Sequence, residues 1–219
     1  MNCSKSLVII SAPSGCGKDT IIERACQRLE GVGVSISCTT RKARPKKDGT
    51  REQHGVEYFF VERPEFEEGV SQDGFLEYAE NYGELYGTPR AYVEKLFAEG
   101  KDVVILNIED QGMRQVVRDN PDAVSIFILP PSAQELRRRL IERKSEPMEK
   151  VEKRMADNIR QMPTAYDYDY VVLNDDLERA VEEVVHIISA ARRRTVLHRE
   201  LIDRINATFA AEEAKQKAD

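Results

Sequence analysis

A short loop near the N-terminus combines small residues with a lysine, and this combination has a clear chemical use. Small residues let successive backbone N–H groups turn toward one anion, and a lysine ammonium adds a positive charge beside them. The loop therefore predicts a phosphate-binding site in which Lys18 reaches the outer phosphates of a nucleotide. The residues expected at this site are Ala12, Pro13, Ser14, Gly15, Cys16, Gly17, Lys18, Asp19 and Thr20.

The elements on either side of this loop must position it. The apolar run at residues 7–10 predicts a buried strand, and the apolar residues between 21 and 29 have the spacing of an amphipathic helix. A plain turn is the alternative, because glycine is also common in turns. The strand before the loop and the helix after it favour the phosphate site. Two positions depart from the pattern G-x-x-x-x-G-K-[ST], since Ala12 replaces the first glycine and Asp19 replaces the hydroxyl residue, with Thr20 one position later.

Composition narrows the class of protein. The chain has 219 residues, 41% of them hydrophobic, and a net charge of −6. This size predicts one α/β domain with small insertions, and the acidic balance argues against general nucleic-acid binding. We see no apolar run of about 18 residues that would span a membrane and no targeting signal, so we expect a cytoplasmic protein without a membrane partner.

The four cysteines lack the spacing of a zinc site or a disulfide framework, which fits a reducing compartment. The role of Cys16 can be interpreted in two ways, because this residue lies in the phosphate loop. A positive environment could lower the pKa of its thiol and make it reactive. The simpler interpretation, a small residue tolerated in a loop, is the one we favour.

A second group of residues has the chemistry to bind a phosphate. Arg41 and Arg44 lie three residues apart beside the hydroxyl residues Ser37, Thr39 and Thr40. Guanidinium donors match phosphate oxygens in a fork, although a charged surface turn would have the same composition. These residues alone leave both interpretations open.

Eight segments of unrelated chemistry then follow one another along the chain. They are APSGCGK at 12–18, SCTTRKARP at 37–45, GVEYFFV at 55–61, FLEYAE at 75–80, YGTP at 86–89, DQG at 110–112, PDAVSIFILPPS at 121–132 and VVLNDDL at 171–177. In this order they resemble the guanylate kinases, members of the P-loop nucleoside monophosphate kinases, over roughly residues 5–190. The resemblance implies a P-loop α/β fold with a five-stranded, mostly parallel sheet flanked by helices.

The resemblance also divides the chain. The core comprises residues 1–36, 90–131 and 164–191, and two insertions interrupt it. A small β-rich subdomain at 37–89 would bind GMP, and a helical lid at 132–163 would close over ATP. Residues 192–219 form an additional C-terminal segment.

For the acceptor, the resemblance assigns seven residues. Ser37, Arg41, Arg44, Tyr58 and Tyr86 would bind the phosphate of GMP, and Glu77 and Thr88 would read its base. A carboxylate can accept from N1–H and the amino group of guanine, while a hydroxyl donates to O6. Adenine presents the wrong edge to both groups, so buried polar atoms would stay unpaired.

For the donor, the resemblance assigns Asn174 and Asp175 to the adenine end of ATP. Lys18, Arg139, Arg143 and Arg154 would be catalytic, because their charges would stabilise the transferring phosphoryl group. The implied reaction converts ATP and GMP, with dGMP as a second expected acceptor, into ADP and the diphosphate. It would need Mg²⁺ and would belong to purine nucleotide metabolism.

The expected metal neighbourhood departs from the family. Asn107 and Glu109 are also expected to bind GMP, and they stand at positions where the family typically has aspartates. We hypothesise that Asp19 supplies, directly or through water, the negative oxygen that Asn107 lacks, so that Asp19, Thr20 and Glu109 are the predicted metal residues. The alternative is that Asp19 points into solvent at the helix start, where a carboxylate is favoured anyway.

Two further segments depart from the family. Residues 46–54 add charged residues to a connection that is usually shorter, which a surface loop tolerates. Leu197, Leu201, Ile205 and Phe209 recur every four residues and predict an amphipathic helix. This helix would dock on the core or on a second subunit, so a homodimer is left open.

Two other functions are compatible with a fold of this kind. Scaffold proteins carry modules of this fold that bind protein ligands, but those modules typically lack an intact phosphate loop. A sugar-phosphate kinase of the same fold, acting for example on a ribose bisphosphate, would share Asp19 after the lysine. Gly15, Gly17, Lys18 and the lid arginines argue against a scaffold module. Glu77, Tyr86 and Thr88 favour the GMP enzymes over a sugar-phosphate kinase.

Overall fold

A computed structural model describes residues 5–46, 49–81, 83–142 and 147–217 of the chain. Its central sheet has five parallel strands, in the order β2-β7-β1-β8-β9. This confirms the P-loop α/β fold expected from the sequence. The strands are β1 (Ser6–Ser11), β2 (Val32–Val34), β7 (Val103–Asn107), β8 (Val124–Leu129) and β9 (Tyr170–Leu173).

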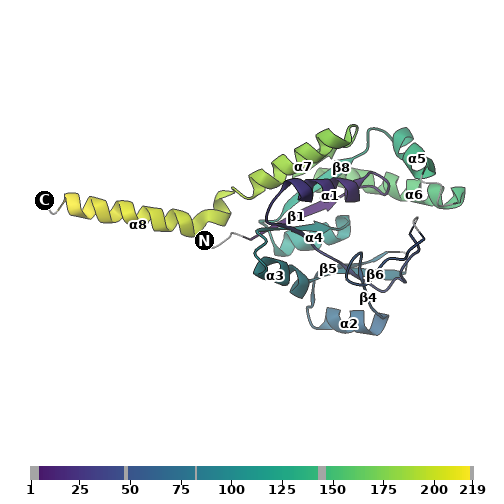
Figure 1. Cartoon of the computed structure of the whole chain (residues 1–219), viewed down its shortest axis with the longest axis horizontal. Coiled ribbons are helices and arrows are strands. Elements are labelled where there is room, and N and C mark those ends of the chain that lie inside the picture. Colours follow the sequence, from purple (N-terminus) through teal and green to yellow (C-terminus); the bar gives the residue numbers. More distant parts are fainter. Residues whose placement is uncertain (1–4, 47–48, 82, 143–146, 218–219) are drawn as a thin grey trace.

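Helices cover both faces of this sheet (Figure 1). The inner strands are therefore buried on both sides, which agrees with their continuous apolar runs. Successive residues of a strand point to opposite faces, so Val8 and Ile10 belong to one core cluster and Ile9 to the other. The first cluster includes residues of α1 (Lys18–Arg28) and α7 (Leu177–Ala191), and the second includes residues of α3 (Arg90–Ala98) and α4 (Asp110–Asp119).

A second sheet lies within residues 37–89, the range predicted for the acceptor-binding subdomain. Its four strands have the order β4-β3-β6-β5, and one helix accompanies them. The elements are β3 (Cys38–Thr39), β4 (Phe59–Phe60), α2 (Arg63–Ser71), β5 (Phe75–Asn81) and β6 (Glu84–Pro89).

Two strands are shorter than the sequence pattern indicates. The apolar and aromatic run at 56–61 contributes only β4, because a turn at Gly55 (φ 79°) occupies the residues before it. Strand β2 ends at Val34 on the central sheet, and β3 begins at Cys38 on the second sheet. The chain passes between the two sheets at this point.

The segment predicted to be the lid contains α5 (Ala133–Glu142) and α6 (Met148–Gln161), followed by the 3₁₀ helix η1 (Met162–Asp167). Leu136, Leu140, Val151 and Met155 are buried in the same core cluster as α1 and α7. Arg143, one of the predicted catalytic residues, lies outside the described residues.

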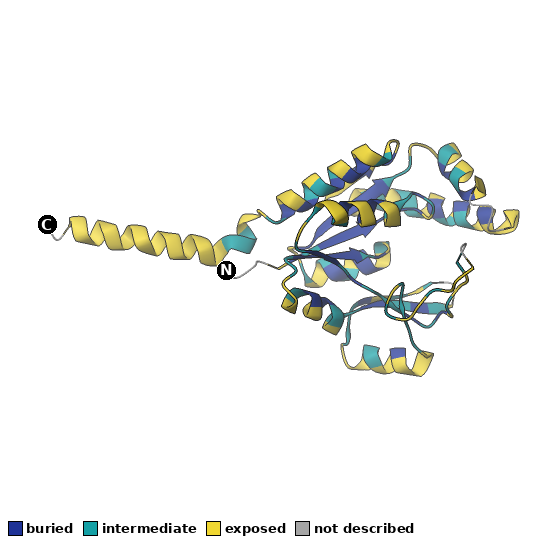
Figure 2. Cartoon of the chain, in the orientation of Figure 1, coloured by how far each residue is buried: buried dark blue, intermediate teal, exposed yellow. Residues whose placement is uncertain are grey.

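After α7 the chain continues through the 3₁₀ helix η2 (Thr195–His198) into α8 (Arg199–Gln216). Helix α8 extends away from the rest of the molecule (Figure 1) and is exposed along its length (Figure 2). Of the two sequence-based interpretations, docking of this helix on the core is therefore wrong. Across the described ranges, we find no helix long and apolar enough to cross a bilayer.

Candidate active site

The phosphate loop connects the end of β1 to the start of α1, as the sequence predicts. Gly15 and Gly17 have φ values of 94° and 92°, in the left-handed region that glycine adopts without strain. The Cys16 backbone N–H donates to the Pro13 carbonyl at 3.1 Å, which closes the turn. Helix α1 begins at Lys18, so the free N–H groups of its first turn lie next to the loop.

Two contacts from the core hold this loop. The Asn174 side chain donates from Nδ2 to the Cys16 carbonyl at 2.6 Å, and the Cys16 thiol lies 3.5 Å from the Ile128 carbonyl. Burial raises the pKa of Cys16 to about 12, so its thiol stays protonated. This excludes the reactive-thiolate interpretation and supports the favoured one, a small residue within the loop.

The structure places the two predicted adenine contacts differently. Asn174 is buried against the phosphate loop, whereas Asp175 is exposed and pairs with Arg179. Asn174 therefore contacts the phosphate loop itself, and a contact of either residue with adenine stays a prediction.

Lys18 is half-buried at the base of the loop. Burial lowers the pKa of its ammonium group, while the nearby carboxylates of Asp19 and Glu109 act in the opposite direction. The charges of Lys18, Asp19 and Glu109 thus influence one another beside the phosphate loop.

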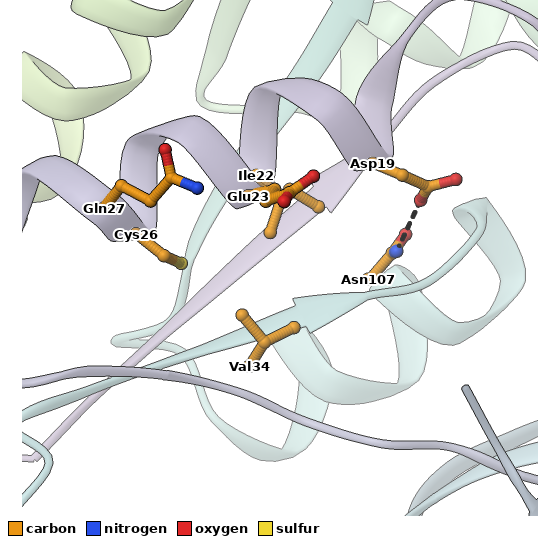
Figure 3. Close-up of a pocket in the computed structure, with 7 residues that line it drawn as sticks. All are labelled: Asp19, Ile22, Glu23, Cys26, Gln27, Val34 and Asn107. Carbon is orange, nitrogen blue, oxygen red and sulfur yellow. Dashed lines mark hydrogen bonds between the residues drawn. The ribbon is translucent and has the colours of Figure 1, made fainter. Parts of the chain in front are cut away.

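Asp19 and Asn107 are in direct contact. The Asn107 side chain donates from Nδ2 to Asp19 Oδ1 at 2.9 Å (Figure 3). Both residues line a pocket of about 520 Å³ between α1 and the ends of β2 and β7. Asp19 is thus exposed to solvent and also hydrogen-bonded to the last residue of β7, so its predicted role toward a metal ion stays a prediction.

The donor set of this region fits a magnesium ion that is held mainly by substrate phosphates. Asp19, Asn107 and Glu109 present carboxylate and amide oxygens, the hard ligands that Mg²⁺ takes. Within the described ranges, no three His, Cys, Asp or Glu side chains lie close enough to bind a metal ion by themselves. Mg²⁺ commonly uses one or two carboxylates, waters and nucleotide phosphates, and these residues fit that mode.

The predicted acceptor-phosphate residues gather on the second sheet. The Arg41 guanidinium is 5.2 Å from the centre of the Tyr58 ring, and the Tyr58 and Tyr86 rings meet edge to face at 6.0 Å. Arg41 is only 8% exposed, whereas Arg44 is exposed and Ser37 half-buried. Folding therefore brings Arg41, Tyr58 and Tyr86 together.

Sequence reasoning missed Glu52, which lies in the charged loop that follows Arg44. Its carboxylate binds the Arg41 guanidinium at two points, 2.8 and 3.1 Å, and accepts from the Arg44 backbone N–H at 2.7 Å. Burial acts to raise the pKa of Glu52, but these hydrogen bonds outweigh it and the net shift is downward. An ionised Glu52 thus fixes Arg41 in place.

The two predicted base-reading residues face each other across β5 and β6. Glu77 and Thr88 are paired in the antiparallel register, and the Thr88 hydroxyl donates to Glu77 Oε1 at 2.7 Å. Glu77 is 5% exposed and Thr88 0%. Burial raises the pKa of Glu77 from 4.5 to about 7, although the bonds from Thr88 act against this shift.

Helix α4 supplies a second residue that the sequence did not reveal as functional. A Cβ atom on Gly112 would lie 2.3 Å from Glu77 Oε2, so the carboxylate packs directly against the helix backbone. The DQG motif at 110–112 was the available signal, and its glycine allows this close approach.

The lid places two of its predicted arginines near the phosphate loop. Arg154 donates from Nε to the Ser14 hydroxyl at 3.0 Å. Arg139 pairs with Glu135 at 2.8 Å and donates to the Asn174 carbonyl at 3.1 Å. Both guanidinium groups thus lie where α5 and α6 approach the phosphate loop and its contact residue Asn174.

Comparison with known proteins identifies relatives that match most of the chain. A family model described as guanylate kinase matches residues 4–191. The chain is 46% identical to the guanylate kinase of Symbiobacterium thermophilum, over 87% of each chain, and 48% identical to a guanylate kinase of Thermus thermophilus, over 86% of this chain and 83% of the relative. A crystal structure of guanylate kinase from Anaplasma phagocytophilum has a TM-score of 0.69 at 30% identity, covering 88% of this chain and 89% of that one.

Proposed function

Because the chain belongs to the guanylate kinase family, we propose that it transfers the γ-phosphoryl group of ATP to GMP, giving ADP and GDP. The observation that carries this proposal is the buried Glu77–Thr88 pair. An ionised Glu77 accepts hydrogen bonds from N1–H and the amino group of guanine, and the Thr88 hydroxyl turns to donate to O6. Guanine provides that pattern of donors and acceptor, and adenine does not.

The groups that act on phosphate support the same reaction. Arg41, Arg44, Tyr58 and Tyr86 bind the phosphate of GMP, with Ser37 at the edge of this group. Lys18 and the loop N–H groups bind the β- and γ-phosphates of ATP. Arg139, Arg143 and Arg154 stabilise the charge of the transferring group, since phosphoryl transfer depends on alignment and electrostatics more than on covalent chemistry.

We also propose that Mg²⁺ accompanies ATP, held by Asp19, Glu109 and Thr20 directly or through water. Bound there, the ion would neutralise charge on the phosphate oxygens. The Asp19–Asn107 hydrogen bond fixes the orientation of the Asp19 carboxylate for this role.

Different parts of the chain have different tasks in this reaction. Residues 37–89 hold the acceptor, residues 132–163 close over the donor, and the core carries the phosphate loop. Closure of both insertions excludes water and suppresses hydrolysis of ATP. We further propose a cytoplasmic enzyme that acts on free nucleotides, accepts dGMP, and forms a homodimer through the exposed apolar residues of α8.

A coupled assay of ADP formation tests the proposed reaction. GMP, dGMP, AMP, UMP and ribose 1,5-bisphosphate serve as separate acceptors, with and without Mg²⁺, for the wild type and Glu77→Ala. We expect turnover with the guanine nucleotides only, dependent on Mg²⁺ and severely reduced in the variant. Turnover with ribose 1,5-bisphosphate would overturn the proposal. The absence of turnover with every acceptor in the panel would overturn it too.

A further inference from the structure

The lid helix α6 contacts the phosphate loop through a buried amide that the predicted reaction does not use. Asn158 is 2% exposed, and both polar atoms of its side chain bond to the backbone of Ser14. Its Oδ1 accepts from the Ser14 N–H at 2.8 Å, and its Nδ2 donates to the Ser14 carbonyl at 3.0 Å. The amide therefore joins two backbone groups of the loop to a helix 144 residues away.

Asn158 occupies a position where packing alone would favour an apolar residue. Val151, Met155 and Asn158 follow each other at helical spacing and are the buried residues of α6. The first two pack into the core cluster. A buried polar side chain in such a stripe needs hydrogen-bond partners, and the Ser14 backbone provides both.

The contact acts on the part of the loop that must be ordered before an anion binds. Gly15 and Gly17 follow Ser14, and glycine loses more conformational freedom on ordering than other residues do. Two hydrogen bonds to the preceding backbone restrict the loop in the free protein. Pre-ordering of this kind raises the affinity for a ligand because less entropy is lost on binding.

We propose that Asn158 is a positioning residue for the donor nucleotide, which holds the phosphate loop in its anion-binding conformation from the lid side. The inference rests on the proposed function in one respect, namely that the loop binds ATP. Arg154, one helical turn before Asn158, contacts the Ser14 hydroxyl, so the same helix brings a lid arginine and the clasping amide to one loop residue. Both side-chain bonds of Asn158 go to Ser14, and the acceptor residues lie on the other sheet. Its effect therefore concerns ATP and not GMP.

Three variants test this proposal. Asn158→Leu removes both hydrogen bonds but fits the apolar stripe, so it is expected to fold with an unchanged melting temperature. Asn158→Ser shortens the side chain and also releases the Ser14 backbone. Ile159→Ala is the control, because Ile159 is the next residue on α6 and is 64% exposed.

We expect the KM for ATP to rise about tenfold in Asn158→Leu and Asn158→Ser, which is the effect of losing hydrogen bonds worth about 1.4 kcal/mol. The KM for GMP should stay within about twofold of the wild type, as should both constants in the control. An unchanged KM for ATP in both variants, or an equal rise for the two substrates together with a lower melting temperature, would overturn the proposal.

Amide hydrogen exchange of the loop in the free protein provides a readout that requires no acceptor. The Ser14 N–H and its neighbours should exchange at least about tenfold faster in Asn158→Leu than in the wild type and in Ile159→Ala. Equal exchange rates would contradict the proposed role of Asn158 in restraining the phosphate loop. If the wild type failed to phosphorylate GMP, the proposed function would fall, while faster exchange in the variant would still support the role of Asn158.

Discussion

At the scale of single residues, we expect the protonation state of Glu77 to govern acceptor binding. Its pKa of about 7 means that the carboxyl is half protonated near neutral pH when the site is empty. Only the ionised carboxylate can accept from both guanine donors. We therefore expect the KM for GMP to rise as the pH falls below about 7, approaching tenfold per pH unit, while the KM for ATP changes little. Initial rates between about pH 5.5 and 8.5 measure this.

The substrate also titrates in this range, because a phosphate monoester has a second pKa near about 6. Glu77→Gln separates the two effects, since its remaining pH dependence comes from GMP. Identical slopes for the wild type and this variant would show that Glu77 does not govern the profile. The variant should also resist unfolding better at about pH 8, because a folded pKa raised above 4.5 stabilises the protein at low pH and this stabilisation is lost as the pH rises through about 7.

Glu52 illustrates a residue that acts through another one. Replacing it by Gln keeps the side-chain size but removes the charge that fixes Arg41 at two points. A less restricted guanidinium binds phosphate less well, so we expect the KM for GMP to rise about tenfold. Initial-rate kinetics at saturating ATP measure the effect.

Glu57→Gln is the matched control for this prediction. Glu57 lies in the same loop but pairs with Lys46 instead of Arg41. Its replacement should leave the KM for GMP within about twofold, as surface pairs contribute little. If both variants raised the KM equally, the loop as a whole and not the Arg41–Glu52 pair would be responsible.

At the scale of elements, the packing of α4 on β5 positions the base-reading carboxylate. Gln115 of α4 donates to the Tyr78 carbonyl at 2.8 Å and accepts from the Tyr78 N–H at 3.2 Å, one residue after Glu77. Gly112 of the same helix leaves room for the carboxylate itself. We therefore expect the specificity of the second sheet to depend on a helix of the core.

This arrangement predicts the effect of Gly112→Ala. Alanine favours a helix by about 1 kcal/mol over glycine, but its Cβ would lie 2.3 Å from Glu77 Oε2 and the carboxylate would have to move. We expect the KM for GMP to rise at least about tenfold without loss of thermal stability beyond a few degrees. The exposed neighbour Gln111→Ala should behave like the wild type, and an unchanged KM in Gly112→Ala would contradict the positioning role of α4.

At the scale of the whole molecule, α8 extends away from the core, while the segment before it is bound to the core. Arg192 pairs with Asp102 at 3.1 Å and Arg194 donates to the Asp122 carbonyl at 2.9 Å, so the chain before the helix is tied to the core. Over its described length, Arg199–Gln216, no residue of α8 is buried. Its apolar side chains, which include Leu201, Ile205 and Phe209, are therefore left to solvent or to a second copy.

Removal of residues 199–219 should leave the catalytic unit intact. Because no residue of α8 is buried, we expect the melting temperature to change by less than about 2 °C and the kinetic constants to stay within about twofold. Light scattering of the full and shortened chains tests the proposed dimer, which should be present only with α8. A large loss of stability in a shortened chain that stays monomeric would show that the helix serves the fold.

Local patterns in the sequence were sufficient for the phosphate loop and for most elements. The apolar run at 7–10 lies within β1, and the helical spacing that begins at residue 21 lies on α1, because both patterns report which positions of one element are buried. The identity of the two insertions came from motif order. The residues Arg41, Glu77, Thr88 and Arg154 could be named in this way without coordinates.

Only the tertiary structure decided which partners these residues have. Glu52 binds Arg41, Gly112 receives the Glu77 carboxylate, and Asn158 clasps Ser14. Each contact joins residues from different elements, and a loop with many charges does not indicate which one faces inward. Hydrophobic periodicity predicts that a side chain is buried, but the polar partner it meets there is set by how the helices and sheets pack.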